Sequence, residues 1–235
     1  MADCINETAC EREARNWRDW LWKCSEIPLW FSATHFLDIR YYGTHNIPEK
    51  GAAILAPNHA TFFDPVLISI PVGRRVNFLA VDKYLKVAFP GLLMKLYGVI
   101  PVREEGSAVE AFAKCVRVLE SDQILGIFPE GGRSEDGELM EFKLGLGLLA
   151  IRSGAPVVPV TIVGGFEAWP KGSLLPRLLP MSVIYHPPLS MKVGKDAPRP
   201  ERRRAARDVS EQVREAVTMG FEMVRRTVRG WELVK

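Results

Sequence analysis

The 235-residue chain lacks several features that would point to common classes of protein. It has only 4 cysteines, which form no Cys-x-x-Cys pair and no cluster with histidine: Cys4, Cys10, Cys24 and Cys115. Such spacing indicates neither a zinc site nor a disulfide framework. We therefore expect a reducing compartment and chemistry that needs no bound metal.

Excess charge and long apolar runs are also scarce. A formal net charge of +3 is too small to indicate a nucleic-acid partner by itself. The N-terminus is acidic where a secretory signal would need positive charge before an apolar run. A membrane-spanning helix needs roughly 18 near-continuous apolar residues, and the uncharged stretches 27–37 and 153–166 are shorter and broken by Pro or Gly. We expect no spanning helix.

The first 38 residues instead carry an amphipathic, tryptophan-rich pattern. Apolar side chains recur at alternating spacings of four and three, on one helical stripe: Cys10, Ala14, Trp17, Leu21 and Cys24. Four of the six tryptophans fall close together: Trp17, Trp20, Trp22 and Trp30. Tryptophan concentrates where one side is apolar and the other wet. We predict that residues 1–38 form helices that associate with a membrane surface; helices packed on the core are the alternative.

Residues 39–235 have the pattern of a single α/β domain. Short β-branched or aromatic runs bounded by Pro, Gly, Asn or charge predict six strands: Ala52 to Ala56, Val76 to Ala80, Val99 to Val102, Ile124 to Phe128, Val157 to Val163 and Ser182 to Tyr185. Between them lie helices, the clearest from Ser107 to Glu120 behind a capping box of Ser107 and Glu110. This alternation predicts a largely parallel or mixed central sheet flanked by helices.

The C-terminal part combines a basic run with a helical apolar stripe. The run contains five arginines: Arg199, Arg202, Arg203, Arg204 and Arg207. The stripe behind it, from Val209 to Val228, predicts a helix packed on the core. The arginines are either a solvated face or contacts for lipid headgroups or for the phosphates of coenzyme A.

Polar clusters follow four of the predicted strands, where ligands usually sit on such sheets. "PNHATFFDP" follows the first strand, and Arg103 ends the third. "PEGGRS" follows the fourth, and Gly164-Gly165 ends the fifth. These clusters should meet at the carboxyl edge of the sheet.

His59 and Asp64 are the first pair to consider for catalysis. Five residues apart on a continuous helix, they would point about 140° away from each other. Asp64 followed by Pro65 has the form of an N-cap followed by proline at the first helical position, which predicts that the helix begins after His59. The chain can then turn between them. The spacing leaves open whether Asp64 only caps the helix or also orients His59.

Four ordered blocks closely resemble those of the glycerolipid acyltransferases, in particular the 1-acylglycerol-3-phosphate acyltransferases: "NHATFFDP", "GVIPVRE", "FPEGGRS" and "VVPVTI". The resemblance covers roughly residues 39–185. It implies transfer of an acyl group from acyl-coenzyme A or acyl carrier protein to the 2-hydroxyl of 1-acylglycerol 3-phosphate, forming phosphatidic acid. Another lyso-lipid acceptor, or a lipid-binding module without turnover, is the alternative. We expect a peripheral protein on the cytoplasmic face of a membrane, with lipid and acyl-thioester substrates, no cofactor and no nucleic acid.

The resemblance also implies roles for individual residues. His59 matches the catalytic base and Asp64 its orienting carboxylate. The acceptor and its phosphate are assigned to matching positions of the second and third blocks: Arg103, Glu130, Gly131, Arg133 and Ser134. Gly98 also matches the second block, whereas Asn58 and Pro159 are assigned to the acyl donor or to the shape of the pocket.

Two positions near the third block need separate comment. Lys143 is a further candidate cation for the acceptor phosphate, or simply a solvated surface charge. Gly132 stands where the family usually has Thr, so the loop lacks a hydroxyl and the identity of the acceptor is less certain.

The implied chemistry fits these residue types. Histidine has a pKa of about 6.5, and a general base of this kind typically contributes about 10²- to 10⁴-fold to the rate. The leaving thiol has a pKa of about 8.5 and can depart as a thiolate. No Gly-x-Ser-x-Gly nucleophile elbow is present. We therefore expect direct transfer, without an acyl-enzyme.

Overall fold

The computed structural model describes residue 28 and residues 38–82, 99–102, 107–169, 177 and 179–232. Seven strands of this part form one sheet in the order β1-β7-β6-β2-β5-β3-β4. They are β1 (Ile39–Tyr42), β2 (Ala53–Pro57), β3 (Val76–Val81), β4 (Val99–Val102), β5 (Ile124–Gly126), β6 (Val157–Val163) and β7 (Met181–Tyr185). Every neighbouring pair is parallel except β6 and β7, which are antiparallel. The predicted mixed α/β fold is confirmed.

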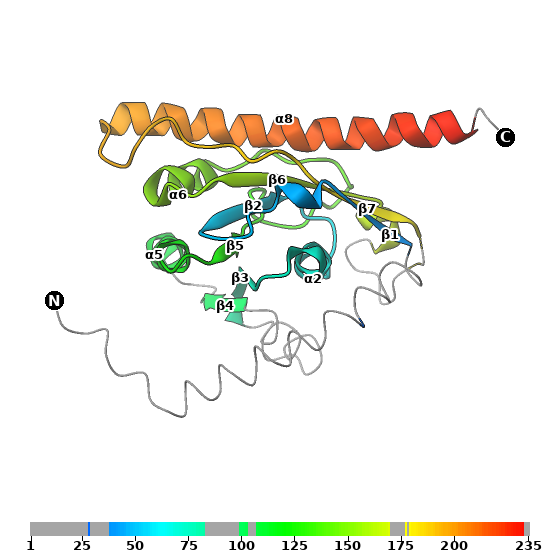
Figure 1. Cartoon of the computed structure of the whole chain (residues 1–235), viewed down its shortest axis with the longest axis horizontal. Coiled ribbons are helices and arrows are strands. Elements are labelled where there is room, and N and C mark those ends of the chain that lie inside the picture. Colours follow the sequence, from blue (N-terminus) through cyan, green and yellow to red (C-terminus); the bar gives the residue numbers. More distant parts are fainter. Residues whose placement is uncertain are drawn as a thin grey trace, which may run out of the picture.

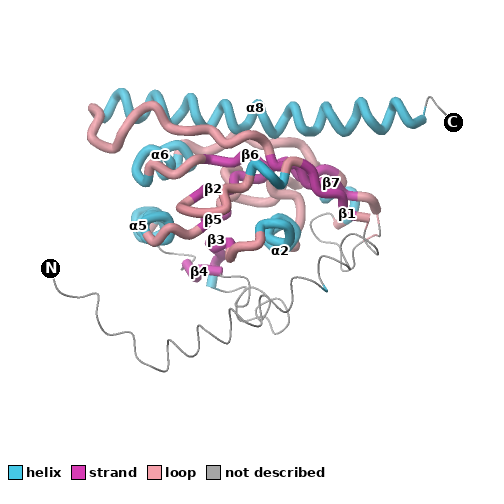
Figure 2. Tube along the Cα trace, in the orientation of Figure 1, coloured by secondary structure: helices cyan, strands magenta, loops and turns pink. Residues whose placement is uncertain are grey.

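The helices cover both faces of the sheet. They are α2 (Asp64–Ser69), α5 (Ala108–Glu120), α6 (Gly145–Ser153), α7 (Gly165–Ala168) and α8 (Arg199–Glu232), with 3₁₀ turns η1 (Thr44–Asn46) and η2 (Ile70–Val72). Figure 1 shows α2 on one side of the sheet and α5 and α6 on the other, with the long α8 laid across the top. Figure 2 shows the loop after β7 running beside α8 to the start of that helix.

Two apolar clusters hold the layers together. Strand β2 contributes to both, because successive side chains of a strand point to opposite faces. Leu55 lies in the cluster that includes Leu67 and Ile68 of α2. Ile54 lies in the other, with Leu119 of α5 and residues of α6 and α8. All five residues of β2 are buried, so this strand is the centre of the core.

The observed strands agree with the sequence predictions, with small differences. The bounds of β4 and β6 are as predicted, whereas β5 ends two residues earlier, at Gly126. Strand β1 was missed by the sequence analysis, because its four residues at the sheet edge include an exposed Arg40 and show no apolar run. Ser107 caps α5 as predicted, since its side chain accepts a hydrogen bond from the Val109 N–H.

Helix α8 is anchored by close backbone contacts. Gly147 of α6 lies so near Ala206 that an added Cβ would collide with the Ala206 backbone. The hydroxyl of Thr161, in β6, donates to the carbonyl of Val217 at 3.1 Å. The hydroxyl of Ser210 donates to the carbonyl of Lys143 at 3.3 Å, which ties α8 to the loop in front of α6.

The basic run occupies the start of α8. Arg199, Arg203, Arg204 and Arg207 are exposed, and Arg202 donates to the carbonyl of Lys195 at 2.9 Å. No helix in the described part of the chain is long and apolar enough to cross a membrane. The predicted membrane-associating segment, residues 1–38, lies outside the described residues except for Pro28 and Asp38, so that prediction stays untested.

The contact between α6 and α8 predicts different effects for two neighbouring glycines. Gly147→Ala should destabilise the fold by about 1–3 kcal/mol, because a methyl group must displace the Ala206 backbone. Gly145→Ala is the matched control, since a Cβ there would meet nothing within 4 Å. It should leave stability unchanged or raise it by up to about 1 kcal/mol. Urea unfolding midpoints would test this; equal midpoints for the two variants would contradict the packing.

Candidate active site

Two loops meet beyond the carboxyl ends of β2 and β5. Strand β2 pairs in parallel with both β5 and β6, so the segments that follow these strands lie at one edge of the sheet. The first loop carries residues 58–63, and the second carries the "FPEGGRS" block, residues 128–134. The sheet thus brings together segments about seventy residues apart in the sequence, as His59 and Glu130 show.

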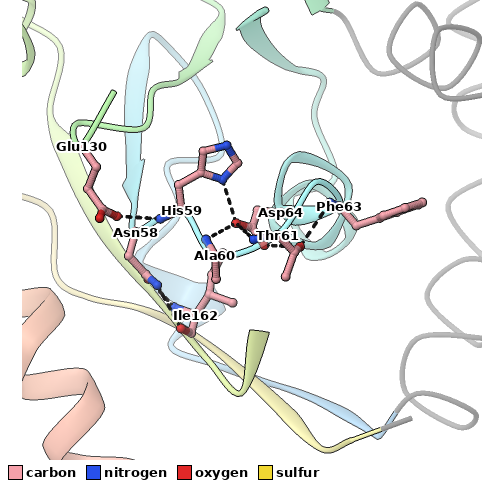
Figure 3. A network of polar contacts seen from close by, with 8 residues as sticks. All are labelled: Asn58, His59, Ala60, Thr61, Phe63, Asp64, Glu130 and Ile162. Atoms are coloured by element: carbon pink, nitrogen blue, oxygen red, sulfur yellow. Dashed lines mark hydrogen bonds and ion pairs between the residues drawn. The ribbon is translucent and has the colours of Figure 1, made fainter. Parts of the chain in front are cut away.

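His59 and Asp64 are in direct contact. His59 Nδ1 lies 2.9 Å from Asp64 Oδ2 (Figure 3). The Asp64 side chain is fully buried, whereas 18% of the His59 side chain is exposed. An ionised carboxylate only accepts hydrogen bonds, so Nδ1 must carry the proton. The imidazole is therefore held in one tautomer, with the lone pair on Nε2.

The same carboxylate organises the loop around it. Besides His59, its Oδ2 accepts from the N–H groups of Ala60 at 2.7 Å and Thr61 at 2.8 Å. Its Oδ1 accepts from the hydroxyl of Thr61 at 2.6 Å. All four donors precede Asp64 in the chain, so the side chain points back into the loop (Figure 3).

The predicted N-cap role of Asp64 is wrong in detail. Helix α2 begins at Asp64 itself, with Phe63 at the cap position and no side chain capping the helix. Pro65 is consequently the second helical residue, where its missing N–H leaves no intrahelical bond unmade. The carboxylate is free to bind the loop because it does not cap the helix. The expectation that the helix begins after His59 is confirmed.

His59 is also held by the third block. Its ring stacks on Phe128 with centroids 3.8 Å apart and an interplanar angle of 21°. Its N–H donates to Glu130 Oε1 at 2.7 Å, and its carbonyl accepts from the Ser134 N–H at 3.0 Å. No residue in the described part of the chain hydrogen-bonds His59 Nε2, and Figure 3 shows this nitrogen turned away from Asp64.

The polar side chains of the third block face inward. Glu130 is buried, and its second oxygen accepts from the Met140 N–H at 3.1 Å. Burial raises the pKa of the Glu130 carboxyl, and the two N–H donors lower it in part. The Ser134 hydroxyl lies within 3.1 Å of Asp136 Oδ1 and within 2.9 Å of the Glu138 carbonyl, and it accepts from the Gly137 N–H. Both side chains therefore bind the protein's own loop.

The cationic residues of this region are less buried than Glu130 and Ser134. Lys143 is exposed and Arg133 is half-buried. The Lys143 N–H donates to the Pro129 carbonyl at 2.9 Å, and its side-chain amine lies against Gly131. Gly131 has φ +78°, a conformation that favours glycine, and an added Cβ would also strike the lysine. Arg133 immediately precedes Ser134, whose N–H holds the His59 carbonyl. Arg133 thus belongs to the block that holds His59, and Lys143 contacts Pro129 and Gly131 of the same block.

Gly132 is less constrained than its neighbour. An added Cβ there would meet nothing within 4 Å, and its φ is not in the left-handed region. The backbone could therefore carry the threonine that is usual in the family, and packing does not impose the glycine.

Asn58 and Pro159 belong to the framework of the site. The Asn58 side chain is buried and pairs with both backbone groups of Ile162, donating to its carbonyl at 3.1 Å and accepting from its N–H at 2.7 Å. Pro159 pairs in register with Ala56 in the adjacent strand. Arg103 and Gly98 lie outside the described residues, so their assigned roles stay predictions.

Two side chains that contact the His59–Asp64 pair, Phe128 and Thr61, were not predicted from the sequence. Both were visible as parts of quoted motifs. Phe128 is the first residue of "FPEGGRS", and an aromatic ring at the end of a strand offers a face for stacking. Thr61 lies three residues before Asp64, a spacing that suits a hydroxyl-to-carboxylate hydrogen bond within a turn.

Comparisons with known proteins agree with the blocks. The acyltransferase family model matches residues 38–163. A 1-acyl-sn-glycerol-3-phosphate acyltransferase of Borreliella burgdorferi is 29% identical over 166 residues, which cover 70% of this chain and 65% of that protein. One of Limnanthes douglasii is 35% identical over 162 residues, 66% of this chain and 55% of that protein. The chain thus spans less than two thirds of the length of these relatives.

A solved structure supports the fold. The crystal structure of the 1-acyl-sn-glycerophosphate acyltransferase of Thermotoga maritima matches with a TM-score of 0.65 and 24% sequence identity. The match covers 91% of this chain and 84% of that one. At this level of identity the similarity establishes the arrangement of strands and helices.

The contact between His59 and Asp64 predicts a defined imidazole tautomer. Neutral His59 should carry its proton on Nδ1 in the wild type, and Asp64→Ala should abolish that preference, because no acceptor then faces Nδ1. Two-bond ¹H–¹⁵N correlation spectra of the imidazoles would measure this. His186, whose Nε2 lies 2.8 Å from the Thr161 hydroxyl, is the internal control and should be unchanged. A wild-type His59 protonated on Nε2 would contradict the geometry.

Proposed function

The chain belongs to the acyltransferase family, and from this premise we propose that it transfers an acyl group from an acyl thioester to the 2-hydroxyl of 1-acylglycerol 3-phosphate, forming phosphatidic acid. The names of its relatives support this choice of acceptor. The observation that carries the proposal is the geometry of His59, with Nδ1 held 2.9 Å from Asp64 and Nε2 free of any partner among the described residues.

His59 would act as the general base. Its Nε2 lone pair takes the proton of the acceptor hydroxyl as the oxygen attacks the thioester carbonyl. The imidazolium that forms is stabilised by the Asp64 carboxylate, which also fixes the tautomer. Phe128 supports one face of the ring and keeps it from turning over. The thiolate then departs and the ester remains, so no acyl-enzyme is needed.

The acceptor phosphate would bind to cations beside this base. Arg133 and Lys143 are the candidates within the described residues, since Arg133 lies in the block that holds His59, Lys143 contacts Gly131 of that block, and neither is fully buried. Arginine grips phosphate through paired donors, and the lysine adds a compact charge. Arg103 is proposed as a third cation from its position in the second block. Together they would orient the glycerol backbone so that its 2-hydroxyl meets Nε2.

The membrane supplies the acceptor in this proposal. A lyso-lipid substrate and its product both reside in a bilayer, so the enzyme would work as a peripheral protein at the cytoplasmic face. Residues 1–38, with their four tryptophans, are the proposed anchor. The thioester donor would be acyl-coenzyme A or acyl carrier protein.

The proposal predicts a specific acyl transfer that depends on His59. Purified protein with lyso-lipid vesicles and a thioester should release thiol and form phosphatidic acid from 1-acylglycerol 3-phosphate. His59→Ala should reduce the rate by about 10²- to 10⁴-fold, because the base is lost. A panel of acyl-coenzyme A, acyl carrier protein thioesters and other lyso-lipids would identify the donor and the acceptor. No thiol release with any pair, or undiminished release by His59→Ala, would refute the function.

The phosphate site predicts a charge-dependent preference. Arg133→Ala should raise KM for 1-acylglycerol 3-phosphate at least tenfold, while a neutral lyso-lipid acceptor changes little, because a charge-assisted hydrogen bond contributes about 1.5–3 kcal/mol. Arg117→Ala, which removes an exposed arginine on α5, is the matched control. Equal changes in KM for the charged and neutral acceptors would argue against phosphate binding by Arg133.

A further inference from the structure

His59 is enclosed by the third block on three sides. Glu130 Oε1 accepts from its N–H at 2.7 Å, the Ser134 N–H donates to its carbonyl at 3.0 Å, and Phe128 stacks on its ring. The first of these is the shortest and the only one of the three made by a charged group. Because the N–H and carbonyl on either side of the Cα are fixed, the direction of the Cα–Cβ bond is fixed too. The location of the imidazole thus depends on the third block as well as on Asp64.

Both oxygens of the Glu130 carboxylate bind the protein. One oxygen binds the His59 N–H and the other binds the Met140 N–H at 3.1 Å, so the side chain joins two segments 81 residues apart. Its residue is only 5% exposed. Figure 3 shows the carboxylate directed at the main chain of His59, on the other side of the backbone from the imidazole. To contact an acceptor, this buried side chain would have to turn out of the loop and weaken its hydrogen bonds to buried N–H groups, which is costly.

We propose that Glu130 is a positioning residue, which fixes the backbone of His59 so that Nε2 meets the acceptor hydroxyl, and that it does not bind the acceptor itself. This inference rests on the proposed function. The division of roles follows the burial of the side chains: the carboxylate lies inside and holds the loop, whereas Arg133 and Lys143 lie toward solvent and are available to a phosphate.

The chemistry of the contact explains why a carboxylate is needed. Two N–H donors converge on one side chain, and a carboxylate offers an acceptor to each. A glutamine has one oxygen and one NH₂, so it can satisfy only one of them and turns a donor toward the other. Glu130→Gln has nearly the same shape and removes a buried charge, so it isolates the hydrogen-bond pattern from packing.

The kinetic test compares two reactions of the same enzyme. Glu130→Gln should lower kcat for acyl transfer by about 10²-fold, the effect of a displacement of about 1 Å at a reacting group, with KM for the lyso-lipid changed by less than about twofold. Slow hydrolysis of the thioester without any acceptor uses the same base with water as nucleophile. It should fall by the same factor. Glu141→Gln, an exposed carboxylate in the same segment, should leave both reactions unchanged.

A second readout needs no activity. The imidazole ¹H and ¹⁵N resonances of His59, assigned by their loss in His59→Ala, should shift in Glu130→Gln in the absence of any substrate, while those of His186 should not. Glu130→Asp keeps the charge but shortens the reach, and it serves as the second variant if glutamine prevents folding. Either variant can test the positioning role, because the test compares the changes in kcat, KM and the His59 resonances with one another.

The outcomes separate the two proposals. A variant with raised lyso-lipid KM, normal thioester hydrolysis and unshifted His59 resonances would overturn the positioning role and make Glu130 an acceptor ligand. A wild-type enzyme that acylates no lyso-lipid would refute the proposed function instead, and the resonances would still decide how Glu130 acts on His59.

Discussion

The site depends above all on the buried carboxylate of Asp64. It collects one imidazole nitrogen, two backbone N–H groups and one hydroxyl, and every donor lies within the five residues before it. A buried charge is tolerated only when it is well hydrogen-bonded, and here the loop itself supplies the bonds. The loop therefore cannot change shape without exposing the charge, and His59 cannot leave without removing one of its partners. The Asp64 carboxylate therefore fixes both the conformation of the loop and the orientation of the His59 ring.

The sheet provides the second constraint by placing two loops at one edge. Strand β2 lies between β5 and β6, and both neighbours contribute contacts to the loop after β2. Glu130 and Phe128, after β5, bind His59, while Ile162, near the end of β6, binds Asn58. The loop that carries His59 is thus held from both neighbouring strands. Strand β2, which precedes this loop, is fully buried, so the loop begins at the centre of the core.

Much of the fold was predictable from the sequence because it follows from local patterns. Short β-branched runs bounded by turn residues predict strands well when both faces are buried, and β6 was predicted with its observed bounds. Strand β1 was not, since an edge strand with an exposed arginine carries little of that signal. The end of β5 was also misplaced: the apolar run continues through Phe128, but that ring stacks on His59 beyond the last ladder pair.

Within the site, the sequence predicted the contact between two side chains, but it did not predict the contacts between side chains and backbone groups. His59 and Asp64 were paired from their motif, but the motif also led to the wrong assignment of Asp64 as the helix cap, because Asp-Pro has the same form in both cases. The Glu130 carboxylate binds two backbone N–H groups and the Ser134 N–H binds the His59 carbonyl, and backbone groups leave no trace in residue types. A motif can name such residues without indicating whether they face the substrate or the protein.

The third block, residues 128–134, contains side chains that bind the protein and others that are more exposed. Its acidic and hydroxyl side chains are buried and hold the chain, whereas Arg133 in the same block is only half-buried. The two adjacent glycines of this block differ in how tightly their surroundings constrain them. Gly131 needs its left-handed backbone and gives Lys143 a surface to lie on, and the Lys143 carbonyl is held in turn by Ser210 of α8. Gly132 faces open space and could be exchanged without strain. The position at which this chain departs from the family pattern is therefore one that packing among the described residues leaves free.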